Sequence, residues 1–308
     1  MKHLLTLRET SASDIQYLLD TATSFKEILA RPVKKVPTLR GRSMLTLFYE
    51  NSTRTRTSFE MAAKIMSAEA INIAVSQSSV TKGESLKDTL LTLQALKADC
   101  VVMRHYASGT PQFAAEHVKI PVVNAGDGRH EHPTQGLLDL LTIRNHKGEL
   151  NGLTVAIVGD ISHSRVARSN IWGLSKMGAA VRLVGPRTLL PPDAECLPVS
   201  VFDNLRDGLE GVDVVNVLRL QTERQERGLL PSLREYSRMF GVTVTSLTAA
   251  KPDVLVLHPG PLNRGVEISA DVADGAYGIR SAIEEQVTNG VAVRMAVLYL
   301  LMGVQEID

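Results

Sequence analysis

The stretch MLTLFYENSTRTRTSFEMAAKIM, residues 44–66, joins an apolar segment to an amphipathic one through a polar turn. The short, largely apolar run at 44–49 predicts a buried strand, which ends at Glu50 and Asn51. The residues STRT then open a helix. The apolar positions of this helix recur at helical spacing, at Phe59, Ala62, Ala63 and Met66. A strand, a turn and a helix in this order are the first part of a βαβ unit.

The same alternation continues along the rest of the chain. An opening helix around 15–22 has Ser11 or Ser13 available as its cap. Further apolar runs predict buried strands at 70–75, 99–103, 121–125, 153–158, 180–184, 212–218 and 253–257. Helical patterns fit about 55–68, 84–97, 110–118, 134–146, 164–177, 203–210, parts of 230–250 and about 282–302. Strands separated by helices imply right-handed crossovers and largely parallel sheets.

We therefore predict an α/β protein of two doubly wound domains, each with a central parallel sheet flanked by helices. The chain of 308 residues is long enough for two domains that each bury a core. We place the first domain at 1–148 and the second at 149–285. The C-terminal helix, about 286–308, is expected to pack back on the first domain.

Composition excludes several classes of protein. Lys and Arg number 34 against 33 Asp and Glu, which rules out the basic surplus of a dedicated nucleic-acid binder. No apolar run approaches the length of about 18 residues that a membrane span needs. Cys100 and Cys196 are too far apart in the sequence to suggest a zinc cluster, and we expect one or both to be buried thiols. We expect a soluble, cytoplasmic protein with no nucleic-acid or membrane partner.

Polar residues collect where the predicted strands end. Such clusters occur at 52–56, 104–105, 126–135, 159–168, 219–224 and 258–264. Ligands of open parallel sheets bind outside the carboxyl ends of the strands. Because the clusters occur in both halves of the chain, we predict a single active site in the cleft between the domains.

The first cluster has the features of a phosphate site. A helix N-terminus offers N–H groups and partial positive charge, to which Ser52, Thr53 and Thr55 add hydroxyl donors. Arg54 can bind two phosphate oxygens with parallel bonds. The alternative is an ordinary capped helix, but capping does not require two arginines. The segment is no Walker loop, since GxxxxGK[ST] does not occur.

The segment GDGRHEHPTQG at 126–136 allows two interpretations. His130 and His132 suggest a metal site, but they lack a third clear ligand nearby. We favour a neutral His132 that donates to a substrate carbonyl, with Gln135 one helical turn away.

Three further segments carry candidate contacts in the second half. Residues 158–169 follow a strand but contain only Gly159 of the dinucleotide-binding pattern, which argues against a dinucleotide site in this segment. Arg165, near the helix start, is better suited to bind a carboxylate. For Arg168 we favour a solvated position on the helix face. Arg219 and Gln221 alternate as at a strand end and so lie on one side. In His258-Pro259-Gly260-Pro261 the prolines cannot donate to a sheet, which leaves carbonyls for a ligand or simply makes a rigid turn.

Taken together, these motifs resemble the aspartate and ornithine carbamoyltransferase family over essentially the whole chain. STRTR with SFE, and HPTQ, resemble the carbamoyl-phosphate half of the family. SSVTKGES (78–85), DISHSRVARS (160–169) and LRLQTER (218–224) resemble its aspartate branch, and the SMG signature of the ornithine branch does not occur. One departure is Gly260, where related chains often carry a larger apolar residue. The implied reaction transfers a carbamoyl group from carbamoyl phosphate to L-aspartate, an early step towards pyrimidines, with neither metal nor organic cofactor.

The resemblance implies a role for each motif residue. The implied contacts to carbamoyl phosphate are Ser52, Thr53, Arg54, Thr55, Arg104, His132, Gln135, Pro259, Gly260 and Pro261, with a cis bond between the last two. The implied contacts to L-aspartate are Ser78, Lys82, Arg165, Arg219 and Gln221. Those with catalytic roles are Arg54, Thr55, Lys82, Arg104 and His132.

The resemblance also implies a homotrimer in which Ser78 and Lys82 reach a neighbouring subunit's site. It leaves open whether the trimer joins regulatory or dihydroorotase chains. Two alternatives remain: a sister enzyme that acts on ornithine or another amine, and a non-catalytic subunit of the same fold. The side-chain cation of ornithine would need an acidic partner, whereas the cluster of Arg219 and Gln221 offers a positive charge.

Overall fold

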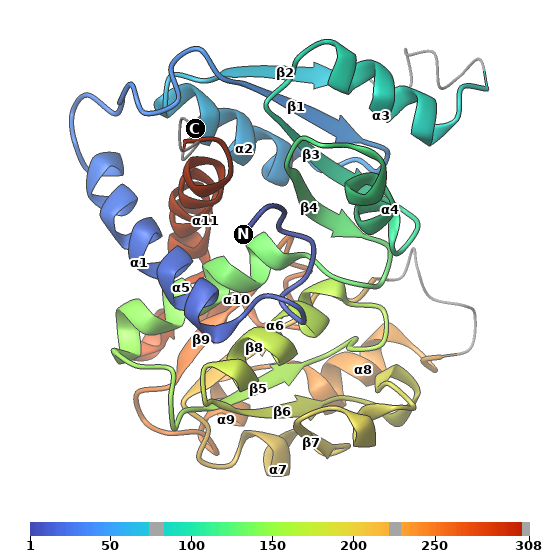
Figure 1. The fold of residues 1–308 in the computed structure, drawn as a ribbon. Helices are drawn as coiled ribbons and strands as arrows, with labels where there is room; N and C mark the ends of the chain where they lie inside the picture. Colours follow the sequence, from blue (N-terminus) through green and yellow to red (C-terminus); the bar gives the residue numbers. More distant parts are fainter. Residues whose placement is uncertain (74–82, 222–228, 304–308) are drawn as a thin grey trace. The chain divides into compact units, whose positions relative to one another are not determined.

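The computed structural model describes residues 1–73, 83–221 and 229–303. The chain forms two compact units (Figure 1), and the chain passes from one to the other within helices. Unit 1 consists of Met1–Leu138 and Thr288–Asp308, and unit 2 consists of Asp139–Val287. The boundaries at 148 and 285 expected from the sequence stay predictions.

Unit 1 is built on a four-stranded parallel sheet in the order β2-β1-β3-β4. Its elements are α1 (Ala12–Leu29), β1 (Ser43–Phe48), α2 (Thr53–Ile65), β2 (Glu69–Ile73), α3 (Leu86–Ala95), β3 (Cys100–His105), α4 (Thr110–His117), β4 (Val122–Asp127) and the start of α5 (Pro133–Lys147). Helices α3 and α4 cover one face of this sheet, with Leu90, Leu93 and Ala114 packed on its valines and leucines. Of the two serines expected as possible caps of α1, Ser11 is the N-cap and accepts from the N–H of Asp14.

Unit 2 is built on a six-stranded parallel sheet in the order β10-β9-β8-β5-β6-β7. Its elements are β5 (Thr154–Val158), α6 (Arg165–Lys176), β6 (Ala180–Val184), β7 (Val199–Phe202), α7 (Leu205–Leu209), β8 (Val214–Val217), α8 (Leu233–Phe240), α9 (Val244–Leu247), β9 (Leu255–Leu257), α10 (Ala270–Ala273), β10 (Arg280–Ser281) and the start of α11 (Ile283–Leu298). Helices α7 to α10 cover one face of the sheet. Because helices cover them, the inner strands β5, β8 and β9 are buried almost throughout.

The later part of α11 belongs to unit 1, where it contacts the N-terminal helices. The Arg294 guanidinium donates to the hydroxyl of Ser58 (3.0 Å) and lies over the ring of Phe59. Beyond α11, a turn of π-helix at Tyr299–Gly303 brings Tyr299 edge-on to Phe25 of α1.

These sheets confirm the predicted α/β class, but the strand at 70–75 was wrongly expected to be buried. Strand β2 lies at the edge of its sheet, and Ile71 is half exposed there. An edge strand has a neighbour on one side only, so an apolar run does not guarantee burial. The short edge strands β7 and β10 did not emerge from the sequence pattern.

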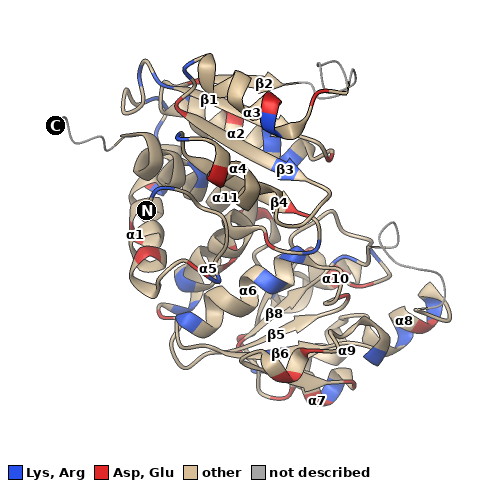
Figure 2. Cartoon of the chain, turned by 45° about the vertical axis from the view of Figure 1, so that its right-hand side comes forward, with Lys and Arg blue, Asp and Glu red and all other residues tan. Residues whose placement is uncertain are grey.

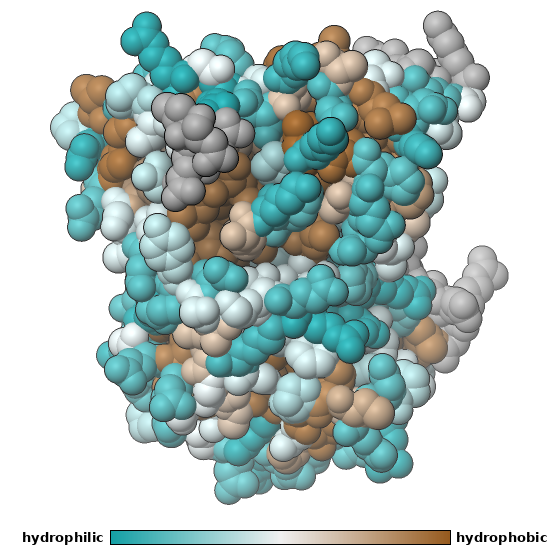
Figure 3. Space-filling view, viewed as in Figure 1, coloured by the Kyte–Doolittle hydropathy of each residue, from teal (hydrophilic) through white to brown (hydrophobic). Residues whose placement is uncertain are grey.

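The surface is mixed in charge and polarity. Basic and acidic residues are interspersed along the chain of both units (Figure 2), in agreement with the net charge of +1. On the face shown in Figure 3, apolar side chains lie among hydrophilic ones. Cys100 is buried and Cys196 is exposed, and both are free thiols. Among the helices of the described residues, none has the length and apolarity needed to cross a bilayer.

Candidate active site

The predicted phosphate-binding residues of unit 1 lie where the strand order of its sheet reverses. The chain runs from β1 outward to β2 and then returns to place β3 on the other side of β1. Ligands of open α/β sheets bind outside the carboxyl ends of the strands at such a point. The STRT segment, 52–55, directly follows β1, and Arg104 of β3 lies in register with Phe48, the last residue of β1.

The N-terminus of α2 is not capped by a side chain. Ser52 occupies the N-cap position with an extended backbone (φ −157°, ψ 95°), yet its hydroxyl makes no capping hydrogen bond. Elsewhere in the described chain, the Ser, Thr and Asn residues at the N-caps of α-helices do accept from their helices: Ser11, Ser85, Ser164, Asn204, Ser232, Thr243 and Ser269. The capping interpretation of Ser52 is therefore wrong, and the binding of an anion at this helix end stays a prediction.

Arg104 is held in place by two acceptors. Its Nη1 donates to the carbonyl of Ala125 (3.1 Å), and its Nη2 donates to the carboxylate of Glu50 (2.7 Å). The side chain is buried, so these contacts fix the direction of the guanidinium. Glu50, which the sequence showed only as the end of a strand, is thus part of the frame around the candidate site.

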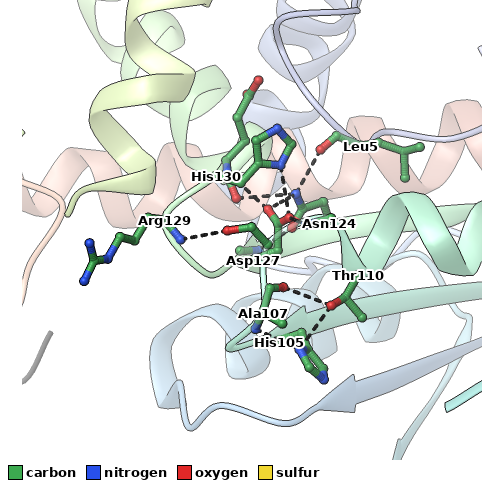
Figure 4. A network of polar contacts seen from close by, with 12 residues as sticks. Leu5, His105, Ala107, Thr110, Asn124, Asp127, Arg129 and His130 are labelled. Atoms are coloured by element: carbon green, nitrogen blue, oxygen red, sulfur yellow. Dashed lines mark hydrogen bonds and ion pairs between the residues drawn. The ribbon is translucent and has the colours of Figure 1, made fainter. Parts of the chain in front are cut away.

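A second carboxylate, Asp127 at the end of β4, organises the loop before His132 (Figure 4). Asp127 is fully buried and accepts from the side chains of Asn124 (2.8 Å) and His130 (3.0 Å). It also accepts from the N–H groups of Gly109 (2.7 Å) and Glu131 (3.1 Å). His130 therefore orders the loop. The described residues contain no group of three or more His, Cys, Asp or Glu able to hold a metal ion.

His132 and Gln135 lie together at the start of α5. The carbonyl of His132 accepts from the N–H of Gln135 (2.9 Å), so the two residues share the first helical turn. His132 is buried, and Gln135 is half buried. On the neighbouring strand, burial lowers the pKa of His105, which keeps that imidazole neutral near pH 7.

The predicted carboxylate-binding residues of unit 2 also lie at a reversal of strand order, between β5 and β8. Arg165 is the first residue of α6, after β5, and is buried, whereas Arg168 is half buried. Arg219 and Gln221 follow β8 and are half buried, while Leu220 between them is packed in the core. The alternation predicted for this segment is present, although the strand itself ends at Val217.

The turn that follows β9 carries the predicted main-chain contacts. Its peptide bond between Gly260 and Pro261 is cis, as predicted. The N–H of Gly260 donates to Nδ1 of His258 (2.8 Å). The other ring nitrogen of His258, Nε2, lies 3.2 Å from Glu267 and donates to it, because Nδ1 is the acceptor.

Some of the predicted features lie outside what the structure describes. Ser78 and Lys82 lie outside the described residues. The cleft between the domains and the individual substrate contacts stay predictions as well. Within each unit, the structure brings the predicted residues to adjacent strand ends.

Comparison with known proteins matches the chain to two domain models in succession. Residues 2–145 match the model of the aspartate/ornithine carbamoyltransferase carbamoyl-P binding domain, and residues 151–301 match that of the Asp/Orn binding domain. The chain is 63% identical over 302 residues to a Heliobacterium modesticaldum protein named aspartate carbamoyltransferase catalytic subunit, with 98% of this chain and 96% of that protein covered.

Solved structures include both branches of the family. Aspartate transcarbamoylase from Trypanosoma cruzi in complex with N-(phosphonacetyl)-L-aspartic acid superposes with a TM-score of 0.88 at 31% identity, covering 98% of this chain and 96% of that one. Ornithine carbamoyltransferase from Pyrococcus furiosus gives a TM-score of 0.87 at 27% identity, covering 99% and 98%. The chain belongs to the aspartate/ornithine carbamoyltransferase family.

Proposed function

We propose that this chain is a transferase that moves the carbamoyl group of carbamoyl phosphate to the α-amine of L-aspartate. The products are N-carbamoyl-L-aspartate and phosphate, which makes this an early committed step towards pyrimidines. The observation that carries the proposal has two parts. The uncapped N-terminus of α2 lies where the strand order of the unit 1 sheet reverses, and Arg165 and Arg219 lie where the strand order of the unit 2 sheet reverses. Relatives named aspartate carbamoyltransferase catalytic subunit, at 56–63% identity, support the choice of substrate.

The residue types suit this reaction. The amine nitrogen attacks the carbamoyl carbon, the bond from that carbon to the phosphate oxygen breaks, and the amine loses a proton that the leaving phosphate can accept. Negative charge grows first on the carbonyl oxygen and then on phosphate, so cationic donors stabilise the transition state. Arg54 and Arg104 serve this purpose in unit 1. Holding both substrates in place supplies a further large share of the rate.

We assign the substrates to the residues as follows. Carbamoyl phosphate is held by Ser52, Thr53, Arg54, Thr55, Arg104, His132 and Gln135, with main-chain contacts from Pro259 to Pro261. L-Aspartate is held by Arg165, Arg219 and Gln221, and by Ser78 and Lys82. The corresponding domains are 1–148 and 149–285, with the C-terminal helix returning to the first.

The experiment that tests the substrate is a comparison of acceptor amines. Purified protein is assayed with carbamoyl phosphate and either L-aspartate or L-ornithine. We expect turnover with L-aspartate, since Arg165 and Arg219 match its carboxylates. Faster turnover with L-ornithine would refute the assignment, and no turnover with any amine would favour a non-catalytic subunit.

We further propose a cytoplasmic homotrimer with shared sites. Two free thiols favour a reducing compartment. Unit 1 exposes large apolar side chains of the kind found at interfaces: Met61, Ile71, Leu91, Leu96, Tyr106 and Phe113. Association with regulatory or dihydroorotase chains is decided by the native mass of the complex in cell extract.

Shared sites can be tested with hybrid trimers. Lys82→Ala and Arg54→Ala homotrimers should each be nearly inactive. After the two are dissociated and reassembled together, some interfaces pair an intact Lys82 with an intact Arg54, so part of the activity should return. Mixed trimers as inactive as their parents would refute the sharing of sites.

A further inference from the structure

A buried carboxylate in unit 2 connects three segments of the chain. Asp139, near the middle of α5, has no exposed surface. Its Oδ2 accepts from the side-chain amides of Asn170 (2.7 Å) and Asn216 (3.3 Å). Its Oδ1 accepts from the side-chain amide of Gln286 (2.7 Å). All three amides are themselves buried, so these bonds are shielded from water.

Two of these amides lie on segments that carry a proposed substrate contact, and the third is hydrogen-bonded to such a segment. Asn170 is one and a half turns along α6 from Arg165, and Asn216 lies on β8 three residues before Arg219. Gln286, at the start of α11, reaches the third segment through a second hydrogen bond. Its Oε1 accepts from the backbone N–H of His258 (2.9 Å), the residue before Pro259.

The turn after β9 has its own internal bonds, and Gln286 joins it to α5. Within the turn, the His258 ring links Gly260 to Glu267, and Glu267 also accepts from the N–H of Asn263 (2.6 Å). These bonds fix the shape of the turn. Two further hydrogen bonds, from the N–H of His258 to Gln286 and from Gln286 to Asp139, fix where the turn lies relative to α5, α6 and β8.

We propose that Asp139 and Gln286 are positioning residues for carbamoyl transfer, which place the Pro259–Gly260 main chain in register with Arg165 and Arg219. This inference rests on the proposed function. Neither residue touches substrate in this proposal. They act because a buried carboxylate that loses one of its donors incurs a large desolvation cost, so the segments shift to restore it.

The test exchanges the donor and the acceptor between the two positions. In Asp139→Asn, an amide nitrogen faces the amide nitrogen of Gln286, so two donors meet. In Gln286→Glu, a carboxylate faces the carboxylate of Asp139, so two acceptors of like charge meet. The double variant restores both bonds of residue 286: the new amide donates to the new carboxylate, which still accepts from the N–H of His258. Gln286→Met, which removes both bonds without adding charge, serves as a further single variant.

Aspartate KM is the informative readout, because an unfolded fraction lowers the apparent kcat without moving KM. Below the Tm of each variant, we expect each single change to raise the aspartate KM at least about tenfold, as for the loss of a hydrogen bond to a charged group. The double variant should lie within about threefold of the unmodified protein. Inhibition by inorganic phosphate should be unchanged, since α2 is untouched.

The exposed pair Gln16 and Asp20 on α1 provides a matched control. The amide of Gln16 donates to Asp20 (3.0 Å), so Gln16→Glu with Asp20→Asn repeats the exchange in water. This control should leave KM unchanged. If folded single variants keep the KM of the unmodified protein, or if the folded double variant does not regain it, the inference is wrong. If the unmodified protein itself does not carbamoylate aspartate, the proposed function is wrong instead.

Discussion

The uncapped N-terminus of α2 leads to a prediction that separates binding from stability. Ser52 and Ser11 are both N-cap serines of unit 1 helices, but only the Ser11 hydroxyl accepts from its helix (Asp14 N–H, 3.0 Å). Replacing each by alanine removes one hydroxyl from a similar position. The two variants should therefore differ in which property they lose.

The expected sizes follow from these contacts. Loss of the Ser11 cap costs about 1 kcal/mol. In a domain of roughly 150–250 residues this lowers Tm by about 2–4 °C. Ser52→Ala breaks no cap and should change Tm by less than about 1 °C. A hydroxyl that donates to a phosphate contributes roughly 1.5–3 kcal/mol, so the KM for carbamoyl phosphate should rise at least about tenfold.

The assay combines thermal unfolding without ligand and steady-state kinetics on the same preparations. Ser11→Ala should shift Tm and leave the KM for carbamoyl phosphate unchanged. Ser52→Ala should do the reverse. If Ser52→Ala lowered Tm as much as Ser11→Ala and left KM unchanged, Ser52 would be an ordinary helix cap and the phosphate site would have to lie elsewhere.

Three further predictions follow from the described contacts. Arg54→Ala should lower kcat roughly 100- to 1000-fold, while Arg219→Ala should mainly raise the aspartate KM; equal kinetic signatures would contradict the division into phosphate and carboxylate residues. Burial raises the pKa of the Cys100 thiol to about 12, so a thiol reagent should modify Cys196 alone in the native protein and both thiols only after unfolding. Burial lowers the pKa of His105 below 6.5, so this residue binds more protons in the unfolded protein, and its contribution to stability, present above pH 6.5, is lost as pH falls through the folded pKa. The variant His105→Asn should therefore show a smaller fall in Tm between pH 7.5 and 5.5 than the unmodified protein. An equal fall in Tm would mean that other groups cause it.

The sequence predicts the inner strands well and the edge strands poorly, for a physical reason. Inner strands of a parallel sheet are covered on both faces, so they appear as apolar runs such as VAIV in β5. The edge strand β7, Val199–Phe202, has two exposed residues and lacks that signal. β10 is only two residues long, which is too short for a recognisable pattern, and it pairs in parallel with β9.

The candidate site residues could be found because cations and hydroxyls are unusual directly after buried strands. Arg104 and the STRT segment stand out against their apolar neighbours, and Arg165 opens a helix. The residues that hold this site in shape were missed. Gln286 follows two glutamates and looks like part of a solvated helix face, and only the fold shows that it is buried. One signal did exist for Asp139, which lies between leucines on both sides in LLDLL.

Asp127 and Asp139 have the same type of role in their two units, and this bears on how a chain of net charge +1 can bind two anions. Each is a fully buried carboxylate that accepts from backbone or side-chain N–H groups: Asp127 from the loop that leads to His132, and Asp139 from the side-chain amides of α6, β8 and α11. Neutral amide donors stabilise a carboxylate through oriented dipoles and carry no net charge of their own. Asp127 and Asp139 thus fix loops and segments, while arginines at the strand ends carry the positive charge, with Arg104 held by Glu50. Charge balance over the sequence says little about the local potential, because the two signs are assigned to different tasks.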